Sequence, residues 1–197
     1  MNTEKRMIHS FEVTQCIQIG SKEIVVAIDE NAADGMKYMC CFVERNDLLE
    51  FYKEAFVSDR YAEIIEIFGE RVNSAAIDFI NESKGMSYQA LTDKDCIPDN
   101  YKDNIQGKIV VRNAKDLRPE YQRAESQLYF VTGGNGSHSN ARGSAVFCTN
   151  LHSGKNVRIE RMEVIGEIKP ECMPEWAKEK AEALKRAEKR KNKEAER

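Results

Sequence analysis

The spacing of the apolar residues changes near residue 46, and this change limits the fold more than any other feature of the sequence. From Phe11 to Ile28 the apolar residues occupy alternate positions, which is typical of half-buried strands. Gly20 and a following serine interrupt the alternation and predict the turn of a β-hairpin. Between residues 59 and 81 apolar residues recur every three or four positions, which predicts a helix that begins at Ser58 or Asp59. The two periods together predict an α+β fold.

Two further elements are expected in the amino-terminal half. Residues 36–43 are apolar and aromatic enough for a strand that is covered on both faces. Residues 47–55 predict a short helix, with Asn46 or Asp47 as its N-cap. The outer face of the longer helix is charged, and we expect it to be solvated. Its charged residues are Glu63, Glu66, Glu70, Arg71 and Asp78.

The carboxyl-terminal half predicts mostly antiparallel β structure. Residues 83–103 are polar, contain Pro98, and predict a long surface connection. Pro119 cannot continue a helix, so residues 117–121 predict a turn. Short strands separated by turns pair most simply as antiparallel neighbours. The expected strands are residues 108–112, 127–132, 144–149, 156–159 and 164–168.

A helix rich in Ala, Glu, Lys and Arg is expected at residues 175–197. Its large apolar residues are Trp176 and Leu184, too few for a coiled coil, so we expect an exposed surface helix. The sequence therefore predicts one domain over residues 1–176, followed by a charged helical tail over residues 177–197. In this α+β fold, two helices follow the amino-terminal strands within residues 1–82, and residues 96–170 are rich in β structure.

The charge distribution excludes a uniformly basic nucleic-acid-binding protein. The net charge is −3, yet the last 21 residues hold nine Lys or Arg and five Glu, so the remainder is acidic. The amino terminus lacks the apolar run of a signal peptide, and no stretch approaches the roughly 18 apolar residues that span a bilayer. We therefore expect a cytoplasmic protein with no membrane partner.

Neither a catalytic motif nor a metal motif appears in the sequence. The six cysteines include no CxxC pair, and we expect them to pack as small apolar residues. Cys148 and His152 have ligand-like spacing, but two ligands are fewer than a zinc site requires. The predictions are no enzyme activity, no metal and no cofactor.

The most distinctive segment is the glycine- and asparagine-rich loop at residues 131–147. Its glycines would free backbone N–H groups, so Gly133, Gly134 and Asn135 could cradle an anion with Arg142 supplying charge. It is not a Walker loop, because GK[ST] is absent at the required spacing. A structural hairpin loop, a contact loop for a partner and a catalytic loop all remain open, in that order of preference.

Basic residues cluster late in the chain and would engage phosphates if they shared a face. The alternative is a solvated helix with Glu and Lys pairs one turn apart, and we favour it over nucleic-acid binding. With the loop, the candidate residues for binding nucleic acid or a partner are Gly133, Gly134, Asn135, Arg142, Lys155, Arg158, Arg161, Lys185 and Arg186.

A series of motifs resembles a family of accessory proteins from conjugative elements, plasmids and phages of Clostridia-like Firmicutes. The motifs are CIP at 96–98, GKIVV at 107–111, LRPEY at 117–121, VTGGNGSHSNARGSAVF at 131–147, NLHSGK at 150–155, VIG at 164–166 and IKPECMPEWA at 168–177. The resemblance covers roughly residues 96–180. Accessory proteins of such elements include type II-A anti-CRISPR proteins, so the resemblance implies a Cas9 inhibitor as its leading function.

The resemblance implies a Cas9-type nuclease as the protein partner, with DNA or guide RNA as a further partner. Carboxylates of the long helix would imitate DNA charge in the nuclease channel. Alternatively the basic cluster would hold nucleic acid, with Arg142, Arg158 and Arg161 as its first candidates. Membership of a mobile-element family equally suits a non-enzymatic, DNA-binding helper of conjugation or plasmid replication.

Overall fold

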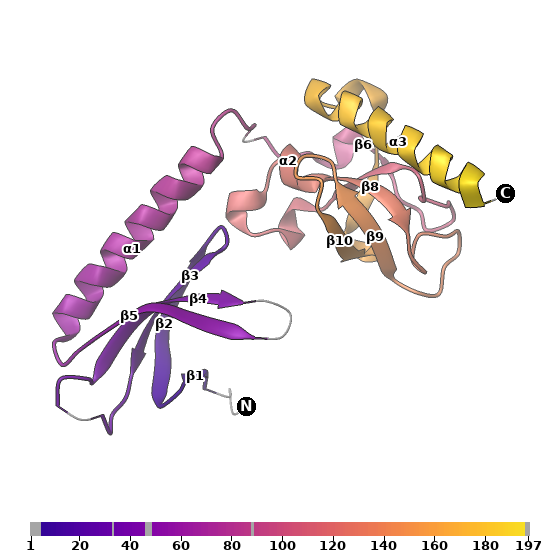
Figure 1. Ribbon diagram of the computed structural model, residues 1–197. Helices are drawn as coiled ribbons and strands as arrows, with labels where there is room; N and C mark the ends of the chain where they lie inside the picture. The colour runs from indigo at the N-terminus through magenta and orange to yellow at the C-terminus, as the bar shows by residue number, and fades with distance from the viewer. Residues whose placement is uncertain (1–4, 33, 46–48, 88, 196–197) are drawn as a thin grey trace. The chain divides into compact units, whose positions relative to one another are not determined.

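The computed structural model describes residues 5–32, 34–45, 49–87 and 89–195, with side chains described as far as residue 187. The chain groups into two compact units, Met1–Gly85 and Met86–Arg197, and each has its own sheet and its own buried core (Figure 1). This grouping differs from the single domain predicted over residues 1–176. The α+β class is confirmed, with antiparallel sheets and a carboxyl-terminal helix.

The sheet of the first unit is an antiparallel meander whose strands follow one another in sequence order. The predicted hairpin is confirmed, because the second and third strands pair through a turn in which Gly20 has a φ of 58°. A left-handed φ of this kind favours glycine. The strands are β1 (Met7–Ile8), β2 (Phe11–Ile19), β3 (Lys22–Ile28), β4 (Tyr38–Arg45) and β5 (Glu50–Ser58).

The predicted long helix is confirmed as α1 (Tyr61–Glu82), which packs on one face of this sheet (Figure 1). Its Ile64 and Ala75 are buried against Ile24, Val26 and Cys40. The predicted cap is wrong, since Arg60 takes the N-cap position without a side-chain hydrogen bond. Ser58 instead accepts a hydrogen bond from the Arg60 backbone N–H and donates one to the Glu63 carboxylate.

The short helix predicted at residues 47–55 is wrong, because β5 occupies most of that range. Its proposed caps, Asn46 and Asp47, lie outside the described residues. Most β5 side chains are exposed, so the strand is held by its ladder of backbone hydrogen bonds to β4 rather than by a buried apolar face. Pairing with an existing strand therefore outweighs the local spacing of apolar residues.

Arg71 does not lie on the solvated face of α1 as predicted. Its guanidinium donates hydrogen bonds to the backbone oxygens of Cys40, at 2.9 Å, and of Glu54. It also lies 5.1 Å from the ring centre of Phe42. The register of β4 and β5 shifts between Cys40 and Phe42, and Glu54 has a φ of 52°. Arg71 therefore satisfies carbonyl groups at a β-bulge, where the ladder is interrupted.

An ion-pair network links the two edge strands of the first sheet, β1 and β5, to the central strand β3. Arg6, just before β1, contacts Glu23 at 2.6 Å, and Arg45 contacts the same carboxylate at 3.3 Å. Glu50, the first residue of β5, lies 2.6 Å from Arg45 and 3.9 Å from Arg6. Glu23 is buried, and a buried carboxylate requires such partners. The network therefore holds the β1 and β5 edges near β3.

The second unit contains an antiparallel sheet with the strand order β10-β9-β8-β7-β11-β6. The five strands predicted for this half are confirmed. A sixth strand, which comes first in the sequence, falls within the predicted surface connection at residues 83–103. Pro119 begins a 3-10 turn, Pro119–Tyr121, as expected. The strands are β6 (Cys96–Pro98), β7 (Ile109–Arg112), β8 (Leu128–Gly133), β9 (Ala145–Asn150), β10 (Asn156–Glu160) and β11 (Val164–Ile168), with a short helix α2 (Ala124–Gln127) before β8.

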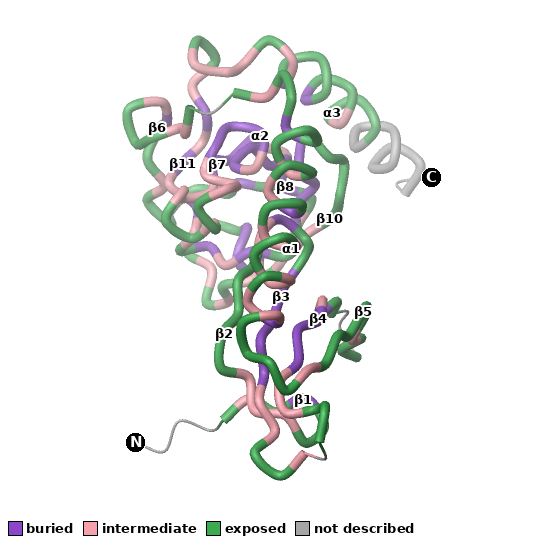
Figure 2. Tube along the Cα trace, turned by 90° about the vertical axis from the view of Figure 1, so that its left-hand side faces the viewer, coloured by how far each residue is buried: buried purple, intermediate pink, exposed green. Residues whose placement is uncertain are grey.

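The carboxyl-terminal helix is confirmed as α3 (Glu175–Ala195), but its first turns are not an exposed tail. Ala177 and Ala181 are buried in one core cluster with Leu128 and Phe130 of the sheet, and Leu184 packs against that cluster. Figure 1 shows α3 lying across β8, and Figure 2 shows β7 as one of the most buried strands. Ala177 and Ala181 lie one turn apart, and their small side chains let the helix backbone approach the sheet closely. A count of large apolar residues does not detect this packing.

Four of the six cysteines are buried as predicted, whereas Cys16 is exposed and Cys172 is half-buried. In the described part of the chain, the helices are too short or too polar to cross a membrane.

We expect Ala181→Asp to destabilise the second unit by roughly 2–3 kcal/mol, because it buries a carboxylate against apolar side chains. Ala183→Asp is the matched control, since Ala183 is exposed on the same helix. Denaturant unfolding followed by the fluorescence of Trp176, the single tryptophan, would measure both. Equal effects of the two substitutions would show that the helix does not pack on the sheet.

Candidate nucleic-acid interface

The glycine-rich loop between β8 and β9 folds on itself. Gly136 N–H donates to the Ala145 carbonyl at 2.8 Å, and Ser137 N–H donates to Gly134 at 3.1 Å. The Asn135 side-chain oxygen accepts from the Ala145 N–H at 3.1 Å. These hydrogen bonds close the loop on itself, so the geometry favours the structural hairpin loop among the three alternatives. The anion cradle of Gly133, Gly134 and Asn135 stays a prediction.

Close packing explains the glycine at position 134. Gly134 has a φ of 108°, and a Cβ there would lie 2.3 Å from the Ala145 carbonyl oxygen. Residues other than glycine rarely adopt this backbone conformation, and their Cβ atom would clash with the Ala145 carbonyl oxygen. Gly133 precedes it at the end of β8, with open space around its Cα. The loop sequence therefore encodes tight backbone packing.

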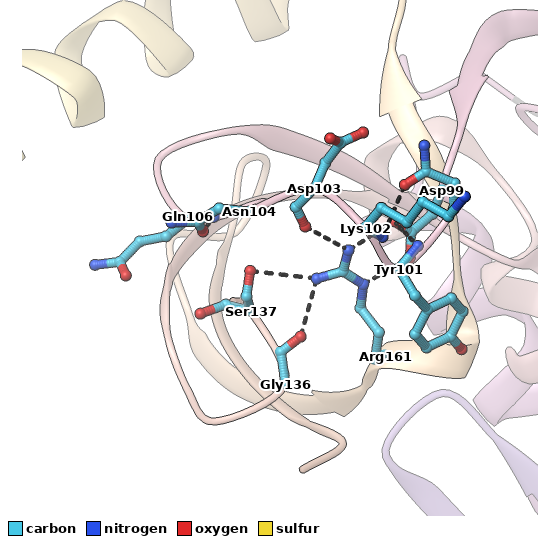
Figure 3. Close-up of polar contacts among 10 residues, drawn as sticks. Asp99, Tyr101, Lys102, Asp103, Asn104, Gln106, Gly136, Ser137 and Arg161 are labelled. Atoms are coloured by element: carbon cyan, nitrogen blue, oxygen red, sulfur yellow. Dashed lines mark hydrogen bonds and ion pairs between the residues drawn. The ribbon is translucent and has the colours of Figure 1, made fainter. Parts of the chain in front are cut away.

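Arg161 is the centre of a buried polar network (Figure 3). Its Nε and Nη2 donate to the two carboxylate oxygens of Asp99, both at 2.6 Å. Nη1 donates to the carbonyls of Gly136 at 2.9 Å and Ser137 at 3.3 Å, and Nη2 also donates to the backbone carbonyl of Asp103 at 3.1 Å. The Arg161 side chain is only 2% exposed. The prediction that Arg161 binds phosphate is therefore wrong, because its N–H groups already donate to Asp99 and to backbone carbonyls of the same unit.

The network joins segments that are far apart in the sequence. Asp99 and Asp103 follow β6, Arg161 follows β10, and Gly136 and Ser137 belong to the β8–β9 loop. Tyr101 covers the guanidinium, whose central carbon lies 5.4 Å from the ring centre. A bidentate arginine–carboxylate pair with further carbonyl acceptors is the arrangement that makes a buried charge tolerable.

An open groove of about 680 Å³ lies on the face of the sheet that α3 covers in part. Alternation along the strands places Phe130, Thr132, Phe147, Thr149 and Arg158 on this face, because Phe130 pairs with Thr149 and Phe147 pairs with Arg158. Leu184 of α3 forms one wall of the groove.

Phe147 is the most distinctive side chain of the groove. It is 50% exposed on the central part of β9, between the buried residues Val146 and Cys148. Its neighbours on the face are polar: Thr149 donates to the Asn156 side chain at 2.8 Å. Arg158 is also exposed, and its guanidinium lies 2.6 Å from Glu160. The groove thus offers an aromatic face with hydroxyl, amide and guanidinium groups beside it.

The other predicted binding residues do not share this groove. Arg142 is exposed on the glycine-rich loop. Lys155 lies in the β9–β10 turn and lines a pocket that is described below. Lys185 lines a hollow with Ile109 and Glu167, and Arg186 pairs with Glu182 at 3.1 Å. In the described part of the chain the predicted residues therefore do not form one basic face.

Phe147, Thr149 and Asn156 of the groove are not among the residues predicted from the sequence. The signal was present, because residues 144–149 were predicted as a strand and Phe147 alternates with Val146 and Cys148. The alternation shows that Phe147 lies on the face of the sheet opposite to Val146 and Cys148. It does not show whether a helix covers that face.

Cys148 and His152 are not brought together as a metal or nucleophile site. Burial raises the pKa of the Cys148 thiol to about 12, so the thiolate is not accessible near neutral pH. Within the described residues, no group of three His, Cys, Asp or Glu side chains is arranged to hold a metal ion.

Comparisons with known protein families, curated proteins and solved structures found no match to this chain.

We expect Arg161→Ala to cost about 3–5 kcal/mol of stability, because it leaves the Asp99 carboxylate buried without its partner. Arg158→Ala removes an exposed ion pair and should change stability by about 1 kcal/mol or less. Unfolding followed by Trp176 fluorescence compares the two variants. If Arg161→Ala is as mild as Arg158→Ala, the buried network does not hold the fold together.

Proposed function

We propose that this chain is a non-enzymatic, nucleic-acid-binding accessory protein of a bacterial mobile element, acting in the cytoplasm. The mobile-element origin rests on the resemblance of residues 96–180. The binding activity rests on one observation, the half-exposed Phe147 in the open groove of the second sheet.

A solvent-exposed aromatic ring on a sheet favours single-stranded nucleic acid as the ligand. Unpaired bases can stack on such a ring, whereas the bases of a duplex are already stacked. Asn156 and Gln106 line the same groove. The Asn156 side-chain oxygen accepts from Thr149 and the Gln106 side-chain nitrogen donates to the Thr132 carbonyl, so the Asn156 amide nitrogen and the Gln106 side-chain oxygen are the groups that can pair with base edges.

The charge beside the groove fits a phosphate backbone. Arg158 lies on the groove face itself. A basic group beside a stacking platform can contact the phosphates of a single strand, and it makes binding sensitive to salt.

We expect Phe147→Ala to weaken binding of a labelled single-stranded oligonucleotide about tenfold or more, because it removes a stacking surface. Phe147→Tyr should retain the affinity, since the ring remains. Fluorescence anisotropy over a series of salt concentrations would measure both variants, and Arg158→Ala should reduce the salt slope by about one.

Met162→Ala is the matched control, because Met162 is a large apolar residue of the same unit and is 78% exposed. It should bind as the unchanged protein does. The proposal fails if the unchanged protein does not bind single strands, or if Met162→Ala weakens binding as much as Phe147→Ala.

A second candidate function is inhibition of a Cas9-type nuclease, the leading implication of the resemblance. The observation that favours it is the exposed acidic side of α1, where Glu66 and Glu70 face solvent. Glu63 and Asp78 add less charge, because they pair with Arg60 and Lys22. A row of carboxylates on a rigid helix can occupy a positively charged nucleic-acid channel.

We expect an inhibitor to reduce target cleavage by a Cas9–guide complex in proportion to its concentration, and most strongly when it is added before the DNA. Glu66→Lys with Glu70→Lys should relieve the inhibition. Glu171→Lys with Glu179→Lys, a charge-matched control on exposed residues of the other unit, should not. Undiminished cleavage by several type II nucleases would exclude this function.

A further inference from the structure

A second pocket, of about 480 Å³, lies on the opposite face of the sheet from the groove. Tyr129 pairs with Asn150, and strand alternation places both on the face away from Phe130 and Phe147, together with Arg112. The volume is within the range of pockets that hold small ligands. Nothing in the proposed use of the groove explains this pocket.

The residues that line the pocket carry more positive than negative charge. Within the described chain the lining contains four basic side chains, Arg112, Arg118, Arg123 and Lys155, against the two acids Asp116 and Glu125. Glu163 lies 3.2 Å from Arg112 and Glu120 lies 3.7 Å from Arg118, so these two carboxylates reduce the positive charge of the lining. The lining still presents guanidinium and ammonium donors from which an anion can accept hydrogen bonds.

Arg112 and Glu125 of the lining each have one buried polar atom with no hydrogen-bond partner among the described residues. One is a donor, the Nε of Arg112, whose Nη2 contacts Glu163 at 3.2 Å. The other is an acceptor, the second carboxylate oxygen of Glu125, whose first oxygen accepts from the Ser87 N–H at 2.8 Å. Buried polar groups are normally paired, so atoms of this kind call for a ligand or an ordered water. A matching ligand carries both an acceptor and a donor.

A nucleoside phosphate has this combination. Its phosphate oxygens would accept from the guanidinium groups, while a ribose hydroxyl or a base amine would donate to Glu125. Tyr121 and Tyr129 supply aromatic surface in the same lining. A ligand with an anion alone would leave the Glu125 oxygen unpaired and would meet its negative charge.

We propose that this pocket binds a nucleoside 5′-phosphate, either as a free nucleotide or as the phosphorylated end of a strand. The proposal does not depend on binding at the groove, because the two sites lie on opposite faces of the sheet.

The structure also supplies a spectroscopic probe for the pocket. His152 lines it, and its ring packs edge-on against Trp176 with the ring centres 5.4 Å apart. Burial, together with the charges of Lys180 and Arg123, lowers the pKa of His152, so the imidazole is neutral near pH 7. A phosphate placed beside His152 would change the surroundings of the single tryptophan.

Titration of the full chain with adenosine 5′-monophosphate, followed by calorimetry and Trp176 fluorescence, tests the proposal. We expect saturable binding that is tighter than binding of adenosine or of inorganic phosphate. Arg118→Gln with Lys155→Gln, both exposed on the rim, should weaken it about tenfold. Glu125→Gln keeps an acceptor for Ser87 but loses the second carboxylate oxygen, so it should weaken adenosine monophosphate binding more than phosphate binding.

Met162→Ala and Glu171→Gln are the controls, since both residues are exposed in the same unit and line neither the groove nor this pocket, and they should leave this binding unchanged. Absence of saturable binding, binding that survives the rim variant, or binding lost in either control would overturn the proposal. Competition identifies the source of the phosphate: displacement by a 5′-phosphorylated oligonucleotide, but not by its unphosphorylated form, supports a strand end. Failure of both oligonucleotides to displace the nucleotide supports a free nucleotide.

Discussion

The second unit depends on the buried ion pair between Arg161 and Asp99. The pair draws together the segment after β6, the corner after β10 and the glycine-rich loop, which do not touch one another in sequence. Those loops connect the strands that carry Phe147 and Arg158, so the pair also fixes the strands on which the groove is built. Its stabilising effect is conditional: the charges are costly to bury, and only the complete set of acceptors offsets that cost.

Elements with a strong hydrophobic period were predictable from the sequence. The β2–β3 hairpin, α1 and five of the six strands of the second sheet follow from the pattern of their apolar residues, because that pattern indicates which sides of each element are buried. The β5 strand was not predictable in this way. Its apolar residues are largely exposed, and only the hydrogen-bonding groups offered by β4 determine its conformation.

The functional residues were harder to predict than the fold. Arg158 and Arg161 are three positions apart and look alike in the sequence, yet one is exposed and the other is among the most buried side chains. The difference arises from Asp99, 62 positions from Arg161, and no local pattern reports such a partner. The polar lining of the second pocket has the same origin, since the strand order brings Arg112 and Asn150 together and Glu125 reaches them from α2.

The bulge held by Arg71 affects how readily β5 could pair with a strand of another chain. β5 is the edge of its sheet and exposes Phe51, Phe56 and Val57. A straight edge strand with exposed apolar residues is a template for pairing with another chain, the first step of aggregation. The left-handed turn at Glu54 breaks that edge between Phe51 and Phe56. Arg71 therefore holds this edge strand in an irregular conformation, which is a poor template for pairing with another strand.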